Sequence, residues 1–416
     1  MSDNSEAAGN KRSTSKSRRN KSQGRTNKMA SKERSDQDAA IKAAVLRDER
    51  VRLLTQENLS LQKKLTRSQT QTDIVVQAVR DTLSTKKIVI DIPAAPKKSK
   101  KTTKREEIPV LCLGDWHIGC HIPGGAYEYN IDIAKKRIQL TVDKFLATVA
   151  DRRTSAKIEE LRLYLIGDMV EGEAMRQGHA HEIEAPVIKQ AVQWAPECLA
   201  GAIVRLMGSF RKIKIVAVPG NHGRNGPPRG DAHPATNWDR VCYQTAKLLV
   251  GNAIAQQDSK RINDIIWDLP ADRTERTGGD DWFSIDYVFD WCNCLLHGED
   301  ITSGNSTFYG VERMVKQYAD IVHDPIDFLF MGHIHTGATI PSNFREVFIN
   351  GAVVSATRFA RKQLVCATPP TQCAVFYTKD NGPISRHTFH LDERVPYGTR
   401  TLRALENRNR FGSRDK

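Results

Sequence analysis

Short apolar runs alternate with longer amphipathic stretches through most of the chain. The runs at residues 163–166, 213–218 and 327–331, which read LYLI, IKIVAV and DFLFM, are typical of buried parallel strands. Helical stretches lie between such runs, for example at residues 131–151 and 185–210. This alternation predicts an α/β domain in which helices cover parallel sheets.

The first 85 residues follow a different pattern. Residues 1–36 are polar and basic with almost no apolar side chains, so burial cannot offset the entropy of ordering them, and they are predicted to be disordered. Residues 37–85 are predicted to form an amphipathic or coiled-coil helix. Over residues 37–68, the residues at heptad position a are Ala44, Val51, Asn58 and Leu65. Those at position d are Arg47, Leu54, Leu61 and Ser68.

The N-terminal helix has two interpretations. In coiled coils, an Asn at a central a position, here Asn58, fixes the register and the two-stranded state, which favours a homodimer formed through residues 37–68. In the second interpretation, a single amphipathic helix packs on the surface of the α/β domain of the same chain. Only the first interpretation predicts a second copy of the chain as a partner.

The remainder of the chain divides at three boundaries. Residues 86–106 are predicted to be a basic linker, in which a short extended stretch is followed by a solvated segment, KKSKKTTKRE. The predicted α/β domain spans residues 107–392, and residues 393–416 form a basic, polar tail. Within the domain, residues 223–239 are rich in Gly and Pro and predict a surface loop at which substrate contacts are expected.

The excess positive charge lies in the N-terminal part of the chain. Residues 1–106 contain 26 Lys and Arg against 12 Asp and Glu, whereas residues 107–416 contain 37 of each. A basic arm favours a polyanionic partner, because each neutralised phosphate releases counterions. This arm has no Phe, Tyr or Trp on which bases could stack, so it predicts sequence-independent binding of nucleic acid. The alternatives are that the arm solubilises the protein or binds an acidic protein.

Composition disfavours several classes of protein. No apolar run reaches about 18 residues, so no membrane span is predicted. The N-terminus lacks the apolar core of a secretory signal. The eight cysteines follow no pattern, and Cys292 and Cys294 lie in an apolar strand, which predicts buried thiols and a reducing, cytoplasmic location. No G-x-x-x-x-G-K-S/T motif indicates a bound nucleoside triphosphate.

Candidate metal ligands lie in five short segments, each directly after an apolar run. The segments are LCLGDWHIG, LYLIGDMVEGE, IVAVPGNHGR, CLLHGED and FLFMGHIHTG. They contain seven potential ligands, Asp115, His117, Asp168, Asn221, His297, His333 and His335, together with His222. Open α/β sheets bind their ligands at the carboxyl ends of the strands, which is where these residues are expected.

Imidazole, carboxylate and amide groups in this combination suit a pair of divalent metal ions. Two such ions about 3.5–4 Å apart can share a hydroxide and clamp both oxygens of an in-line displacement at phosphorus. The pair needs a bridging carboxylate, for which Asp168 is the candidate. Imidazoles combined with Asp and Asn oxygens suit Mn, Fe, Zn or Ni. The five segments therefore predict a two-metal hydrolytic site.

The order of the segments, D-x-H, G-D-x-x-D/E, G-N-H-D/E, H and G-H-x-H, resembles the calcineurin-like metallophosphoesterase family over residues 107–392. The resemblance implies a four-layer αββα sandwich, in which two mixed β-sheets are flanked by helices. It also implies two sets of metal ligands that share Asp168. The first set is Asp115, His117, Asp168 and His335, and the second set is Asp168, Asn221, His297 and His333.

By the same resemblance, the catalytic residues are Asp168 and His222. The resemblance implies that His222 protonates the leaving oxygen or stabilises the transition state. The family usually has Asp or Glu after the Asn-His pair to hold that histidine, whereas this chain has Gly223, which predicts weaker support for His222. The domain is also similar to metallophosphoesterases of tailed phages, several of which have the sequence G-N-H-G-R at this motif. This resemblance implies a location in the cytoplasm of a bacterial host. The loop after Asp168 is loosely similar to the archaeal D-family polymerase small subunit.

The histidines outside these segments are interpreted as surface or loop residues. They are His121, His179, His181, His233, His323, His387 and His390. The partial exception is the pair His179 and His181, because both follow closely after Asp168 in the sequence.

The preferred functional interpretation is a nuclease or phosphodiesterase that hydrolyses nucleic acid by attack of a hydroxide bridging two metal ions. Mn²⁺ is the first choice of metal, with Fe, Zn, Ni and Mg as alternatives. Two other interpretations are a small-molecule phosphatase or nucleotide phosphodiesterase, and a nucleic-acid-binding scaffold with an inactive site. Every expected ligand position is filled, which disfavours the scaffold.

Overall fold

A computed structural model gives the structure of the chain as two compact units, Met1–Val76 and Gln77–Lys416. The structure describes residues 32, 34, 37, 42–60, 62, 73–82, 91–98, 103–124, 127–175, 178–225, 236–257, 260–270, 282–299, 325–341, 346–357 and 367–392. Within these ranges, no helix combines the length and the apolar character needed to cross a membrane.

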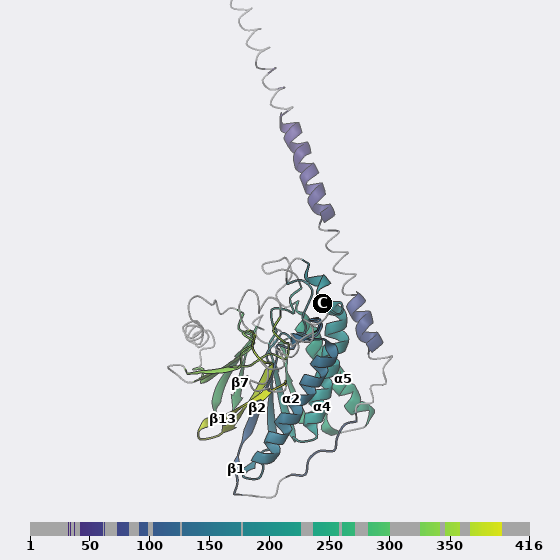
Figure 1. The fold of residues 1–416 in the computed structure, drawn as a ribbon. Helices are drawn as coiled ribbons and strands as arrows, with labels where there is room; N and C mark the ends of the chain where they lie inside the picture. The colour runs from purple at the N-terminus through teal and green to yellow at the C-terminus, as the bar shows by residue number, and fades with distance from the viewer. Residues whose placement is uncertain are drawn as a thin grey trace, which may run out of the picture. The chain divides into compact units, whose positions relative to one another are not determined.

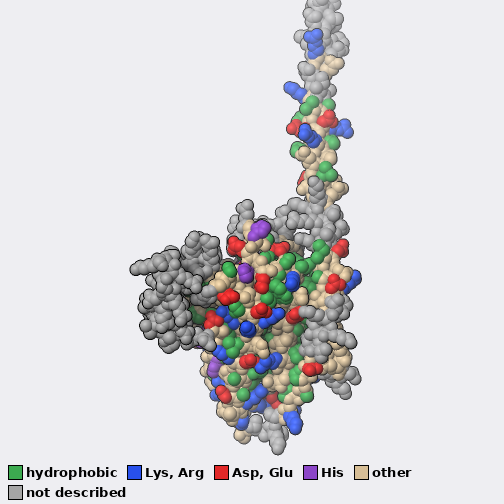
Figure 2. Space-filling view, turned by 45° about the vertical axis from the view of Figure 1, so that its right-hand side comes forward, with side chains coloured by type: hydrophobic (Ala, Val, Ile, Leu, Met, Phe, Trp, Pro, Cys, Tyr) green, Lys and Arg blue, Asp and Glu red, His purple; other side chains and the backbone are tan. Residues whose placement is uncertain are grey.

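The described part of the first unit is helical. Residues 42–60 form a helix, as the heptad pattern predicts. The apolar side chains of Val51 and Leu54 are each 56% exposed, and Figure 2 shows apolar side chains on the surface of this helix. Leu61 and Leu65, and residues 1–31 of the predicted disordered tail, lie outside the described residues, and self-association through the helix stays a prediction.

The second unit contains a six-stranded sheet in the order β13-β12-β2-β4-β5-β6. Strands β2, β4, β5 and β6 are parallel, and β12 runs antiparallel to its neighbours β2 and β13. The strand bounds are Ile108–Leu113 (β2), Glu160–Leu165 (β4), Lys212–Ala217 (β5), Ile265–Asp268 (β6), Thr371–Thr378 (β12) and Gly382–His390 (β13). The parallel strands predicted from LYLI and IKIVAV are therefore confirmed as β4 and β5.

A second sheet has five strands in the order β10-β11-β9-β8-β7. Strands β8, β9 and β11 are parallel, and β7 and β10 are antiparallel strands at its two edges. The strand bounds are Phe283–Val288 (β7), Trp291–Leu296 (β8), Phe328–Met331 (β9), Ala338–Pro341 (β10) and Glu346–Ile349 (β11). A short parallel pair, Arg105–Glu106 (β1) with Ala156–Lys157 (β3), lies apart from both sheets.

Three long helices lie together against one face of the six-stranded sheet (Figure 1). They are α2 (Ile131–Arg152), α4 (Ala195–Met207) and α5 (Trp238–Gln256). Four shorter helical segments are also described: η2 (His179–His181), α3 (Val187–Lys189) and the π-helical η3 (Gln190–Trp194) precede α4, and η4 (Lys260–Asp264) follows α5. Phe145, Leu199 and Tyr243 pack with strand residues such as Leu163 and Ile215 in a single buried core, which stabilises this face.

The two sheets pack face to face around a second apolar core. Tyr164 of β4 and Val216 of β5 lie in this core with Phe330 of β9 and Phe348 of β11. The α/β fold class and the sandwich of two mixed sheets are thus confirmed. The apolar cluster on the outer face of the five-stranded sheet includes no residue of a described helix, so the described ranges do not test the fourth layer of the expected sandwich.

A buried ion network also joins the sheets. Asp286 of β7 is fully buried, and its carboxylate accepts from Arg162 Nε at 3.1 Å, Tyr164 Oη at 2.8 Å and Lys214 Nζ at 2.5 Å. A buried carboxylate without such partners would be strongly destabilising, so the network fixes how β7 meets β4 and β5.

Part of the predicted linker is attached to the second unit. The Ile92 amide donates to Gln257 Oε1 at 2.8 Å, and Arg261 and Arg211 donate to the carbonyl oxygens of Pro93 and Pro96 at 3.0 Å and 2.9 Å. The Ile92 side chain packs against the helix-side core. The extended stretch before the solvated basic segment is therefore attached to the domain, which satisfies its apolar and backbone groups.

Candidate metal centre

The predicted site residues lie at one edge of the sandwich because each follows the carboxyl end of a strand. Asp115 comes two residues after β2, Asp168 three residues after β4 and Asn221 four residues after β5. In the second sheet, His297 directly follows β8, and His333 follows its parallel neighbour β9. The parallel arrangement brings these five strand ends together.

The backbone of these residues has an unusual conformation. Six described non-glycine residues have φ in the left-handed region, and five of them are predicted ligands. These five are Asp115 (φ 49°), His117 (49°), Asp168 (50°), His333 (65°) and His335 (60°). Such conformations cost about 1 kcal/mol or more each and concentrate at functional sites. The strain is the cost of turning these side chains toward a common centre.

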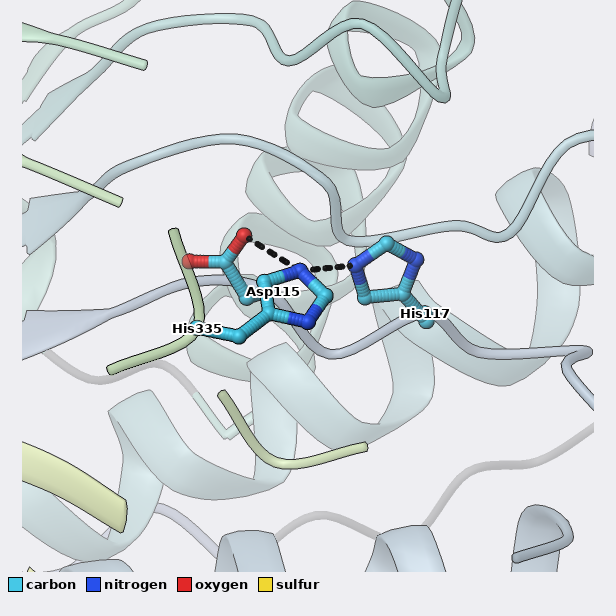
Figure 3. A group of neighbouring side chains, drawn as sticks. All are labelled: Asp115, His117 and His335. Atoms are coloured by element: carbon cyan, nitrogen blue, oxygen red, sulfur yellow. Dashed lines mark hydrogen bonds and ion pairs between the residues drawn. The ribbon is translucent and has the colours of Figure 1, made fainter. Parts of the chain in front are cut away.

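One cluster of potential ligands contains Asp115, His117 and His335, with one donor atom from each within 4.8 Å of the others. His335 Nε2 lies 3.0 Å from His117 Nε2 and 3.4 Å from Asp115 Oδ1. Figure 3 shows the His335 ring between the other two side chains. Two imidazole nitrogens and a carboxylate oxygen that converge in this way form a donor set for a divalent cation.

The second cluster contains Asp168, His297 and His333, again with donor atoms within 4.8 Å. His297 Nε2 lies 3.0 Å from Asp168 Oδ2. The side-chain oxygen of Asn221 lies 3.0 Å from His297 Nε2 and 2.9 Å from His333 Nδ1. Asn221 thus adds a neutral oxygen donor to two imidazoles and a carboxylate, a set that suits Mn, Fe or Zn.

Asp168 lies between the two clusters. Its Oδ2 atom is 3.8 Å from His117 Nε2 of the first cluster and 3.0 Å from His297 Nε2 of the second. The residue is 1% exposed. A buried carboxylate within reach of both donor sets fits the bridging ligand of a metal pair, and all seven predicted ligands are brought together at this edge.

His222 has an acidic partner that the sequence analysis missed. Its Nδ1 atom lies 2.9 Å from the Glu171 carbonyl oxygen and 3.4 Å from Glu171 Oε2. The expectation that Gly223 leaves His222 weakly supported is therefore wrong, because Glu171 takes the place of an acid at position 223. The signal was present in the sequence, since Glu171 is the final residue of the G-D-x-x-D/E segment.

Glu171 also contacts two further histidines. Its carboxylate oxygens lie 2.8 Å from His117 Nδ1 and 2.8 Å from His179 Nε2. His179 is 1% exposed, so its interpretation as a surface or loop residue is wrong, whereas His181 is exposed as expected. One buried carboxylate therefore orients a predicted metal ligand, the predicted catalytic histidine and His179 together.

Burial and mutual charges determine the protonation of the site. Burial alone would raise the pKa of Asp168, but the cationic His297 and His222 outweigh it and hold that pKa well below its usual range. Burial opposes protonation of His297, yet the Asp168 carboxylate raises its pKa to about 9. Burial, aided by the charge of His297, lowers the pKa of His333 to about 4.

The same balance applies to His222 and Glu171. Burial alone would lower the pKa of His222, but the charges of Glu171 and Asp168 raise it to about 10. Burial alone would raise the pKa of Glu171, but the charge of His222 and the hydrogen bonds of His117 and His179 hold it well below its usual range. The pair therefore consists of an imidazolium and a carboxylate at neutral pH, which suits His222 to proton donation.

Metal binding is predicted to strengthen as the pH rises. A metal ligand must be a neutral imidazole, and the raised pKa of His297, about 9, means that a metal ion must displace its proton below that pH. The apparent Mn²⁺ affinity should rise by about tenfold per pH unit for that one proton and level off above pH 9. Isothermal calorimetry at pH 7 and 8, in buffers of different ionisation enthalpy, measures both affinity and proton release. Equal affinities without proton release would contradict the prediction.

A comparison with family models agrees with this centre. The model of the family described as calcineurin-like phosphoesterase matches residues 108–337. A comparison with curated proteins found no match.

The solved structures to which the chain is similar at low identity include the following three. Vps29 of Entamoeba histolytica complexed with Zn²⁺ has 10% identity and a TM-score of 0.27, covering 68% of this chain and 99% of its own. A hypothetical protein of Pyrococcus horikoshii OT3 has 9% identity and a TM-score of 0.35, covering 72% and 94%. A predicted phosphoesterase of Streptococcus pneumoniae TIGR4 has 11% identity and a TM-score of 0.26, covering 68% and 98%.

The family match spans more than half of the chain and contains all five ligand segments. The residues that it covers form both donor clusters at the sheet edge. The chain belongs to the calcineurin-like phosphoesterase family and is a metal-dependent phosphoesterase.

Proposed function

We propose that the protein is a nuclease, a phosphodiesterase that hydrolyses nucleic acid with two Mn²⁺ ions. The observation that carries this proposal is the position of Asp168 between two donor clusters, with His222 beside them. One set of ligands is Asp115, His117, Asp168 and His335, and the other is Asp168, Asn221, His297 and His333. Two metal ions bound there supply an activated water and neutralise charge on the phosphoryl group.

His222 is proposed to donate a proton to the leaving oxygen. Its side chain is 21% exposed, so substrate can reach it. Because Glu171 engages Nδ1, the proton is delivered from Nε2. Glu171 fixes the ring, and its charge keeps the ring protonated. The ring also lies 4.4 Å from the His117 ring, centroid to centroid, which places the proton donor at the edge of the first donor cluster.

The choice of nucleic acid rests on how charge is distributed. The arm of residues 1–106 carries the whole net charge of +14, and the remaining residues are neutral in sum. On the face of the second unit seen in Figure 2, acidic and basic side chains are mixed. The arm is therefore the part suited to bind a polyanion, by contacts to phosphates and independently of sequence. The exposed apolar side chains of helix 42–60 support a homodimer as a further proposal.

A substrate panel tests the proposed activity. Purified protein with Mn²⁺ should cleave single-stranded DNA, duplex DNA or RNA with higher kcat/KM than bis-p-nitrophenyl phosphate. Asp168→Asn should lose metal and all hydrolysis while keeping the fold measured by circular dichroism, because the only carboxylate shared by the clusters is gone. Hydrolysis of small phosphate esters without cleavage of any polynucleotide would favour a small-molecule phosphatase. Full activity of Asp168→Asn would refute the metal assignment.

His222→Ala is predicted to keep both metals and to lower kcat by about 10²–10⁴-fold. Since Glu171 supports His222, we expect a loss in the upper part of that range. Metal content by mass spectrometry and kcat on the same preparation separate the two effects. His121→Ala, which alters an exposed histidine, serves as the control and should change neither. A loss of metal equal to that of Asp168→Asn would show that His222 is structural.

Removing residues 1–76 is predicted to weaken binding to long DNA or RNA and to flatten its salt dependence. This segment contributes 17 Lys and Arg against 9 Asp and Glu, and its removal leaves the attached stretch around Ile92 in place. Turnover of bis-p-nitrophenyl phosphate should stay unchanged, because the centre is untouched. Equal polynucleotide binding by the two proteins at low salt would exclude residues 1–76 as a tether. Light scattering on the same pair tests the homodimer, which a full-length monomer at micromolar concentration would exclude.

A further inference from the structure

The first turn of α5 reaches under the metal centre. Asp239 is fully buried, and both of its carboxylate oxygens accept from backbone amides. Oδ2 accepts from Asp168 N at 2.8 Å and Gly220 N at 2.9 Å. Oδ1 accepts from Met169 N at 3.0 Å and Val170 N at 3.3 Å. One carboxylate therefore ties the loop that carries the bridging aspartate to the loop that carries Asn221.

Asn237 completes this contact. Its Nδ2 atom donates to the Gly220 carbonyl at 2.8 Å, and its Oδ1 atom caps α5 by accepting from Asp239 N at 2.8 Å. The Trp238 amide donates to the Gly223 carbonyl at 2.6 Å. The start of α5 thus holds the backbone on both sides of the Asn221–His222 pair. We name Asn237 and Asp239 together the α5 clasp.

One glycine leaves space for the clasp, and another leaves space for the Asp168 side chain. A Cβ atom on Gly223 would lie closer than 3.0 Å to the side chain of Asn237, and one on Gly220 would lie closer than 3.0 Å to the side chain of Asp168. The φ angle of Gly223 is not in the left-handed region, so the demand at this position is for space alone. The glycine that departs from the family's usual Asp or Glu is therefore the residue against which Asn237 packs.

We propose that Asp239 is a positioning residue of the metal centre. We also propose that position 223 must be glycine because any larger residue would displace Asn237 of the α5 clasp. The clasp sets the place of Asp168 relative to Asn221, two ligands that must be held to within about 0.5 Å for tight metal binding. It also offsets the strained backbone of Asp168 (φ 50°), whose amide is one of its four donors. This inference rests on the proposed two-metal centre and not on the nature of the substrate.

Asp239→Asn tests the role of the clasp, with Asp286→Asn as the matched control. Both aspartates are fully buried, but Asp286 accepts from side chains at Arg162 and Lys214, in the first halves of β4 and β5. Mn²⁺ affinity of chelator-stripped protein, measured by electron paramagnetic resonance well below the unfolding temperature, should fall about 10–100-fold in Asp239→Asn. The kcat for bis-p-nitrophenyl phosphate should fall more than its KM changes. Asp286→Asn should lower the unfolding temperature and leave Mn²⁺ affinity unchanged.

If Asp239→Asn does not fold, a second pair of variants tests the same proposal. Gly223→Ala adds the Cβ that Asn237 excludes, whereas Gly251→Ala, later in α5, adds a Cβ that meets nothing within 4 Å. Gly223→Ala should weaken Mn²⁺ binding and Gly251→Ala should not. Gly223→Asp, which restores the family residue, should weaken Mn²⁺ binding further. Mn²⁺ affinity equal to that of the unaltered protein in Asp239→Asn, or in Gly223→Ala and Gly223→Asp together, would overturn the proposal.

The outcome is separate from that of the proposed function. Mn²⁺ affinity is measured without substrate, so a protein that cleaves no polynucleotide can still show the loss in Gly223→Ala. In the converse case, polynucleotide cleavage with Mn²⁺ affinity unchanged in these variants would retain the nuclease and remove Asp239 from the metal centre.

Discussion

The carboxylate of Asp168 lies between two groups of imidazoles in a place with almost no contact with solvent. Burying an anion there is costly unless cations and donors surround it. The cationic His297 and His222 meet part of that requirement and hold its pKa low. When a pair of divalent ions binds, it displaces the proton of His297 and would compensate the carboxylate in its place. The positions of the other ligands follow from this requirement, since each must approach one of the two sides of a single carboxylate.

Convergence on one point requires backbone conformations that the strands alone would not adopt, and the helical layer stabilises them. The carboxylate of Asp239 in α5 accepts hydrogen bonds from four backbone amides in the loops around Asp168 and Gly220. Gln190, in the π-helical turn before α4, accepts from the Gly172 amide at 3.0 Å and donates to the Ala185 carbonyl at 2.8 Å. Short π-helical turns are frequent at functional sites. The apolar faces that bury these helices therefore also determine the geometry of the loops.

Much of this arrangement could be predicted from the sequence, because strands and ligands have local signals. A short apolar run that ends at glycine identifies both the strand and the residue at its end, as for β4 and Asp168. Asp239 has no such signal, since an acid in the first turn of a helix is ordinary, and its four partners come from loops that only the fold brings near. The burial of His179 and the attachment of the stretch around Ile92 have no local signal for the same reason, because both depend on partners that are distant in the sequence.

The sharing of Glu171 limits how substitutions in the site can be interpreted. Its carboxylate contacts His222, but it also contacts His117, whose opposite nitrogen lies 3.0 Å from His335 in the first donor cluster. A neutral residue at 171 would therefore disturb the proton donor and a metal ligand at once. Its effect on rate cannot be assigned to His222 by subtraction, since residues in one hydrogen-bond network are not additive. A double-mutant cycle is needed, in which Glu171→Gln and His222→Ala are made singly and together. Metal content measured for each of the four proteins then separates the support of the proton donor from the support of the metal.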